Sequence, residues 1–206
     1  MKYVKKMPDI DVALSQKLRN DGWEKLKEPP NLAFATLCAM PFALLLGGIT
    51  IWIAYLLNPL LFEFLKGETL KITITFNFMT QLFIIVILVF MLLHEMIHAI
   101  FIPNFMKSDK TFFGINGMFG FVFTTEPIKK WRFIIISIMP CVLLSFVLPF
   151  ILNLFGLLNG YTVFLCLLNA MGSCVDVLNL FLITFQVPNG NTIINNGFET
   201  YYKYTK

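Results

Sequence analysis

The distribution of charged residues constrains the fold of this chain more than any other feature. Asp, Glu, Lys and Arg are absent from residues 29–62, 72–94, 133–175 and 177–198. A helix needs roughly 20 apolar residues to cross a bilayer, and each stretch supplies that many positions or more. Because 57% of the 206 residues are hydrophobic and only 14% are charged, the sequence predicts an integral membrane protein.

Four spans are expected, at about 32–57, 78–102, 132–157 and 161–186. Their ends coincide with residues that stop helices or favour tight turns, namely Asn58, Pro59, Pro103, Asn159, Gly160 and Pro188. The sequence therefore predicts an all-α membrane fold with four transmembrane helices.

The spans make up one domain at 31–187, between a polar tail at 1–30 and a second tail at 188–206. Apolar residues recur at helical spacing in the first tail, at Ile10, Leu14 and Leu18. This tail is either a short helix at the membrane interface or a solvated segment.

Lysine and arginine counts in the connecting segments predict the orientation. The N-terminal tail, the three successive loops and the C-terminal tail hold seven, two, five, zero and two of them. Positive residues accumulate on the cytoplasmic side of a membrane protein. We therefore expect a multi-pass protein of the cytoplasmic membrane with both termini in the cytoplasm. The net charge of +4 is modest, and no nucleic-acid partner is expected.

Residues 111–125, "TFFGINGMFGFVFTT", lie between the second and third spans and are too short to cross a bilayer. Phe119, Phe121 and Phe123 recur at the period of a strand, and three glycines break any helix. A short hairpin or extended segment at the cytoplasmic interface is expected, and an apolar loop resting on lipid headgroups is an equal alternative.

Residues 94–98 read His-Glu-Met-Ile-His and lie inside the second span. On a helix, His94 and His98 share one face about 6 Å apart, so both imidazoles can reach one metal ion. Glu95 lies about 100° around the helix, where it can reach an attacking water without being a ligand. This is the HExxH arrangement that binds Zn²⁺ and uses the carboxylate as a general base.

Short motifs arise by chance, and a histidine pair on a helix is more often structural. Here these are the only two histidines of the chain. Ionisable side chains inside a membrane are also expensive unless they are paired or neutralised. Both points favour a metal site.

Asp176 is the candidate for the third ligand that a catalytic zinc usually takes. It and Glu95 are the two acids that lie well inside expected spans. The depths of the second and fourth spans place Asp176 within a few Å of the histidines along the membrane normal. A buried acid paired with a polar neighbour is the alternative.

Asn169 and Ser173 lie on the same helical stripe as Asp176. Both are candidates for substrate binding, with Asn169 holding a substrate backbone or a developing oxyanion. Polar residues on such a stripe also join helices to one another, so the two interpretations stay open.

The motif "HEMIH" at 94–98, followed by "NAMGSCVD" at 169–176, resembles the integral-membrane zinc metalloproteases of the site-2 protease type. More closely, roughly residues 80–200 resemble small four-span bacterial proteins called putative zincin peptidases. The resemblance implies that His94, His98 and Asp176 are zinc ligands and Glu95 the base. It also implies that an unfolded substrate aligns along a strand in 111–125 by edge addition, which makes Phe119 and Phe121 candidate contacts.

Together these features predict a zinc peptidase that is embedded in the lipid bilayer and acts on membrane-associated or transmembrane polypeptides. Three alternatives remain open. They are a zinc hydrolase of a non-peptide substrate, a metal-binding or transport protein, and an inactive scaffold that regulates a partner.

Overall fold

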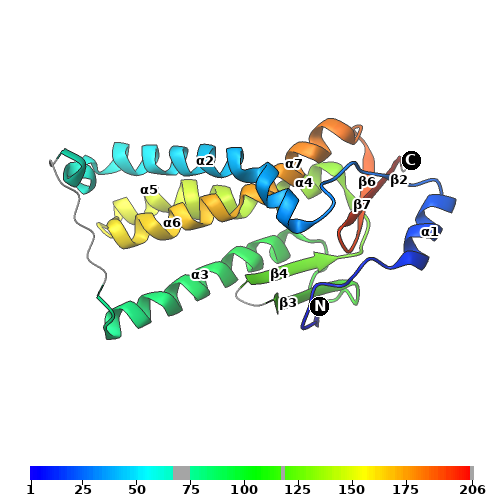
Figure 1. Cartoon of the computed structure of the whole chain (residues 1–206), viewed down its shortest axis with the longest axis horizontal. Coiled ribbons are helices and arrows are strands. Elements are labelled where there is room, and N and C mark those ends of the chain that lie inside the picture. Colours follow the sequence, from blue (N-terminus) through cyan, green and yellow to red (C-terminus); the bar gives the residue numbers. More distant parts are fainter. Residues whose placement is uncertain (67–74, 117–118, 205–206) are drawn as a thin grey trace.

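The computed structural model of the chain describes residues 1–66, 75–116 and 119–204 (Figure 1). Its helices are α1 (Val12–Asn20), α2 (Leu32–Leu57), α3 (Phe78–Phe101), α4 (Lys130–Cys141), α5 (Leu148–Leu154), α6 (Gly160–Gly172) and α7 (Cys174–Gln186), with a 3₁₀ helix η1 (Pro59–Lys66) and a π-helical segment η2 (Val142–Val147). Its strands are β1 (Lys2–Tyr3), β2 (Glu24–Lys25), β3 (Thr111–Asn116), β4 (Phe119–Thr124), β5 (Ile128–Lys129), β6 (Asn191–Asn196) and β7 (Glu199–Tyr204).

Within the described residues, four helical segments are long and apolar enough to cross a membrane, as the four expected spans require. They cover Leu32–Leu57, Phe78–Phe101, Lys130–Leu154 and Gly160–Gln186. Asn31, Asn77 and Asn159 begin three of them, and each side chain accepts hydrogen bonds from backbone N–H groups of the first turn.

The third and fourth segments are interrupted. Between α4 and α5 lies the π-helical segment η2, and Pro140 and Pro149 lie on either side of it. Proline has no backbone N–H and disrupts the regular helical hydrogen bonds, while π-helical turns occur often at functional sites. Between α6 and α7 the helix is broken only at Ser173. This break places Asp176 in the first turn of α7.

Helix α2 packs against α6 and α7, and α4 packs against α3 and α7. Small residues make close approach possible: Ala39 and Ala43 of α2 are buried against Cys174 and Leu178 of α7. Such contacts are typical of helix packing in membranes. Within α3, all of whose residues are described, only Ala99 is buried. The remaining large apolar surface of α3 is suited to contact with lipid.

The described strands form two small sheets at one end of the helical bundle, so the fold is not purely helical (Figure 1). One has the order β1-β3-β4 and contains the antiparallel hairpin expected in 111–125. The other has the order β2-β7-β6-β5. The apolar-loop alternative for 111–125 is therefore wrong.

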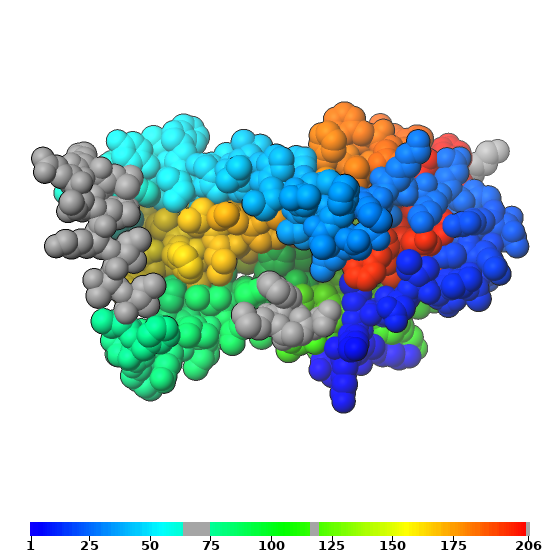
Figure 2. Space-filling view, viewed as in Figure 1, coloured from blue at the N-terminus to red at the C-terminus, as the bar shows by residue number. Residues whose placement is uncertain are grey.

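The second sheet joins the two tails. Strand β2 of the N-terminal tail pairs with β7, and the helix α1 lies in the same region. Figure 2 shows the first residues (blue) and the last residues (red) gathered at this one end. Asn196 connects them further, because its side chain accepts from Asp11 N and donates to Asp11 O and Ser15 Oγ.

Gly197 makes the β6–β7 hairpin possible. Its φ of +59° favours glycine, and a Cβ there would lie 2.9 Å from the backbone of Asp9 and Ile10. The backbone of Asp9 and Ile10 in the N-terminal tail therefore packs directly against the turn at Gly197. In the described part of the chain, the two tails are thus paired with each other in one sheet.

Lys130 fastens the sheet end of α4 to the end of α7. It is 8% exposed, and its Nζ donates to Thr184 O, Val187 O and Asn189 Oδ1 at 3.0, 2.6 and 3.3 Å. A cation at a helix C-terminus satisfies carbonyls that have no intrahelical partner. Lys130 therefore sets the position of α7 relative to α4.

Glu199 gives the joined tails a pH dependence. Burial alone would raise its pKa, but hydrogen bonds from Lys25, Tyr201 and Ser15 lower it to about 2. A depressed pKa stabilises the fold above the unfolded-state value near 4.5, and the stabilisation is lost as the pH falls towards 2. The contribution is at most roughly 3 kcal/mol, reduced by screening at the half-exposed Lys25.

At pH 5 we expect the amides of β2 and β7 to be better protected from hydrogen exchange in the wild type than in Glu199→Gln. This extra protection should shrink as the pH is lowered from 5 to 3. The measurement is hydrogen exchange of the detergent-solubilised protein, with Glu24→Gln as the neighbouring control. The Glu28 carboxylate takes up its proton at a higher pH than Glu199 does, because burial raises the pKa of Glu28. Equal pH dependence in the wild type and Glu199→Gln would contradict this assignment.

Candidate metal centre

Three side chains from two helices meet at the end of the bundle that carries the sheets. His94 and His98 lie near the end of α3, and Asp176 lies in the first turn of α7. The two Nε2 atoms are 3.1 Å apart, and Asp176 Oδ2 lies 3.4 Å from that of His94 and 3.5 Å from that of His98. The expectation that these residues converge is confirmed, and the three could hold a metal ion.

The distances among these atoms fit a zinc ion. Ligand atoms bound tetrahedrally at about 2.0 to 2.2 Å are separated from one another by about 3.3 to 3.6 Å. The three observed separations of 3.1 to 3.5 Å lie in or close to this range. Two imidazoles and one carboxylate are also a donor set that zinc accepts. The residues therefore fit the metal that the motif indicates.

The other nitrogen of each imidazole is held by an acceptor. His98 Nδ1 lies 2.7 Å from the backbone carbonyl oxygen of Ile136, which cannot donate, so Nδ1 carries the proton. His94 Nδ1 lies 2.8 Å from Asn169 Oδ1. Because each Nδ1 is held by an oxygen acceptor, both rings turn Nε2 towards the same point, which is the arrangement that metal-binding histidines require.

The orientation of the Asn169 amide follows from its neighbours. Its Nδ2 donates to Pro140 O at 3.2 Å and to Ser145 Oγ at 2.7 Å, and Ser145 Oγ in turn donates to Cys166 O. Both N–H groups of the amide are used within the protein, so Oδ1 faces His94. In this arrangement Asn169 has no amide N–H left for a substrate or an oxyanion.

Ser173 is fully buried, and its hydroxyl donates to Asn169 O one turn earlier. This bond lies at the break between α6 and α7. The described structure thus has Ser173 buried at this break, and contact of Ser173 with a substrate stays a prediction.

Glu95 faces the strand β4. A Cβ built on Gly120 would lie 2.9 Å from Glu95 Cγ, so the strand approaches this side chain as closely as a glycine allows. The backbone of Val122, on the same strand, lies next to the Glu95 carboxylate. The carboxylate thus lies between the histidine pair of its own helix and the backbone of β4.

Strand β4 pairs with β3 on one side, and among the described strands no other strand pairs with it. Phe121 lies on the face of β4 opposite to Gly120, with its ring over Gly114 of β3. Phe119 begins β4, but its side chain lies outside the described part of the chain. Contact of either phenylalanine with a substrate stays a prediction.

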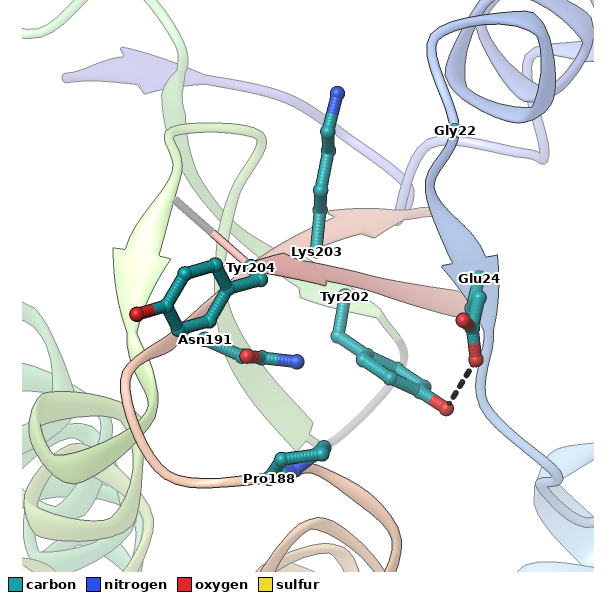
Figure 3. Close-up of a pocket in the computed structure, with 7 residues that line it drawn as sticks. All are labelled: Gly22, Glu24, Pro188, Asn191, Tyr202, Lys203 and Tyr204. Atoms are coloured by element: carbon teal, nitrogen blue, oxygen red, sulfur yellow. Dashed lines mark hydrogen bonds between the residues drawn. The ribbon is translucent and has the colours of Figure 1, made fainter. Parts of the chain in front are cut away.

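A pocket of about 470 Å³ lies elsewhere, on the sheet that joins the tails (Figure 3). It is lined by Gly22, Glu24, Pro188, Asn191, Tyr202, Lys203 and Tyr204. Tyr202 donates a hydrogen bond of 2.7 Å to Glu24 along its wall. None of these residues belongs to the metal centre, so the cavity and the candidate chemistry are separate.

Sequence reasoning did not single out Ile136 or Ser145, which position the metal-binding side chains through backbone or hydroxyl groups. One signal was available: the third span contains two prolines, at 140 and 149, which interrupt a helix that must satisfy its own backbone in a membrane. Prolines at these positions predict a kink, but the pattern alone does not show which group binds the carbonyl that each proline leaves unpaired.

Comparison with known proteins gives a family match. A family model described as putative zincin peptidase matches residues 87–192, slightly more than half of the chain. The matched region contains the histidine pair, Glu95, the hairpin and Asp176. No curated protein and no solved structure matches.

Proposed function

Because this chain belongs to the putative zincin peptidase family, we propose that it is a membrane-embedded zinc metallopeptidase. One observation carries the proposal: two imidazole Nε2 atoms and a carboxylate oxygen from separate helices lie 3.1 to 3.5 Å apart. His94, His98 and Asp176 would hold the metal. When bound, zinc supplies Lewis-acid activation of water and of the scissile carbonyl.

Glu95 is the general base in this proposal. Its carboxylate takes a proton from the attacking water and delivers it to the nitrogen of the leaving amine, so the proton count balances over the cleavage. Its position beside both the histidine pair and β4 supports the role. Neither a metal carrier nor a scaffold needs a carboxylate at this place.

The proposed substrates are membrane-associated or transmembrane polypeptides that align in extended form along β4. An unpaired strand edge offers backbone donors and acceptors to any extended peptide, whatever its side chains. The close approach of Gly120 and of the Val122 backbone to Glu95 supports this alignment, since the strand thereby lies next to the base.

We place the protein in the bacterial cytoplasmic membrane as a multi-pass protein with both tails in the cytoplasm. The joining of the two tails in one sheet supports a common side for both. The metal centre lies towards that same end of the bundle, because His98 is close to the end of α3 and Asp176 lies in α7, which continues into the tail.

A comparison of membrane peptides in cells tests the function. Cells that carry Glu95→Gln should accumulate uncleaved polypeptides that cells with the wild type process. Accumulation of an uncleaved lipid or small amide instead would indicate a non-peptide hydrolase. If Glu95→Gln fully replaces the wild type in a deletion strain, the scaffold alternative is correct and the peptidase proposal fails.

Gly120→Ala is expected to reduce peptide cleavage by roughly 10- to 100-fold, because the new Cβ would displace the Glu95 side chain and small misplacements of a catalytic group are costly. Zinc content should not change. The measurement is kcat on a cleaved peptide together with metal content. Gly172→Ala is the control, since a Cβ there meets nothing within 4 Å. Equal activities of the two variants would contradict the close contact.

A further inference from the structure

Pro140 lies where the hydrogen bonds that orient both histidines meet. It is buried near the end of α4, next to the π-helical segment η2. In an α-helix the carbonyl of residue i accepts from the N–H of residue i+4. The regular partner of the Ile136 carbonyl is therefore residue 140, and a proline has no N–H to give.

The unpaired carbonyl has a different partner here. Ile136 O accepts the hydrogen bond of 2.7 Å from His98 Nδ1. A buried carbonyl that lost its helical partner would otherwise be costly in a membrane, where no water replaces the missing donor. Pro140 thus leaves the Ile136 carbonyl free as an acceptor, and His98 Nδ1 supplies the donor that this carbonyl lacks.

Pro140 also acts on the other histidine. Asn169 Nδ2 donates one hydrogen bond to the carbonyl oxygen of Pro140 and a second to Ser145 Oγ of η2. These two acceptors orient the amide so that its Oδ1 faces His94 Nδ1 at 2.8 Å. One residue therefore contributes to both of the hydrogen bonds that turn the Nε2 atoms towards Asp176.

We propose that Pro140 is a positioning residue of the metal centre, which acts by withholding an N–H from Ile136 and not merely by bending the helix. The proposal rests on the proposed zinc site, but it concerns metal affinity and makes no use of the cleaved bond. Partners of the second nitrogen of a metal-binding histidine typically change affinity by about 10- to 100-fold when they are removed.

Pro140→Ala supplies the missing N–H, which can then pair with Ile136 O and compete with His98. We expect zinc affinity, measured by competition with a chromophoric chelator on the full-length protein in detergent, to fall by about 10- to 100-fold. Pro149→Ala is the matched control, because Pro149 is also fully buried in the same interrupted helix. Its affinity should remain within about threefold of the wild type.

A backbone substitution distinguishes the effect of the missing N–H at position 140 from the effect of the proline ring. Lactic acid at position 140, introduced as an amide-to-ester replacement, lacks the ring as alanine does and lacks the N–H as proline does. We expect it to bind zinc within about threefold of the wild type, and this result decides the matter even if Pro140→Ala does not fold.

Three outcomes would overturn the proposal: equal affinity of Pro140→Ala and the wild type, an equal loss in Pro149→Ala, or a tenfold or greater loss with lactic acid. If the wild type itself binds no zinc, the proposed function fails instead, and the two failures are thereby distinguished.

Discussion

Replacement of Glu95 by glutamine is expected to reduce peptide cleavage by about 10²- to 10⁴-fold, the usual contribution of a general base. The amide has nearly the same size and cannot take a proton from water. Its neighbours, Gly120 and Val122, contact the side chain stem and the polar end, so the substitution should leave α3 and β4 in place. The measurement is kcat on a membrane peptide with the purified protein.

The metal content of the same preparation is the internal control. His94, His98 and Asp176 remain, so Glu95→Gln should bind zinc as the wild type does. If the variant loses its zinc, Glu95 belongs to the ligand set and its role as a base is wrong. If it keeps both zinc and full activity, another group accepts the proton.

Asp176→Ala is expected to lower zinc affinity by at least about 100-fold, more than the loss of a residue that only supports a ligand. Removal of the carboxylate leaves two imidazoles, and zinc sites of this type use three protein ligands. Zinc per chain should fall from about one to near zero after dialysis against a chelator, and cleavage should be lost with it.

Asn179→Ala provides the comparison, because Asn179 lies one turn after Asp176 on α7 and takes no part in the hydrogen bonds and ion pairs described for His94, His98 and Asp176. It should retain zinc. Unchanged zinc content in Asp176→Ala would remove the carboxylate from the site, even though its oxygen lies 3.4 and 3.5 Å from the two imidazoles.

The four spans and most of their boundaries could be predicted from the sequence because membrane insertion is a local property. Each stretch without charges must form a helix to satisfy its own backbone in lipid, and proline or asparagine marks its end. The third span differs most: its helix begins at Lys130 and ends at Leu154. Lys130 belongs to it because its ammonium group finds three acceptors at the end of α7.

The pairing of the two tails could not be predicted from local pattern. The Asn196-Gly197 pair between two strand-forming runs does indicate the β6–β7 hairpin. The partner strand β2, however, lies about 175 positions earlier, at Glu24–Lys25, and two exposed residues carry no periodicity. Only the folded bundle brings these segments together.

Part of the candidate site could likewise be predicted from the sequence, and part could not. The spacing of His94, Glu95 and His98 on one helix was sufficient to indicate zinc chemistry, since helical geometry places the two imidazoles together wherever the helix lies. Asp176 was identified because a buried acid in a membrane needs a partner and few were present. The approach of its Oδ2 to both Nε2 atoms agrees with that reasoning.

By itself, the sequence determined that this chain forms apolar helices and that ionisable groups from two of them must neutralise one another, because lipid offers neither water nor counterions. The tertiary structure decided which donors and acceptors face each other around them. Asn169 faces His94 and not an open site, and Ile136 O faces His98, because the rotation of each helix about its axis depends on packing against all its neighbours. A linear pattern of residues does not contain that rotation.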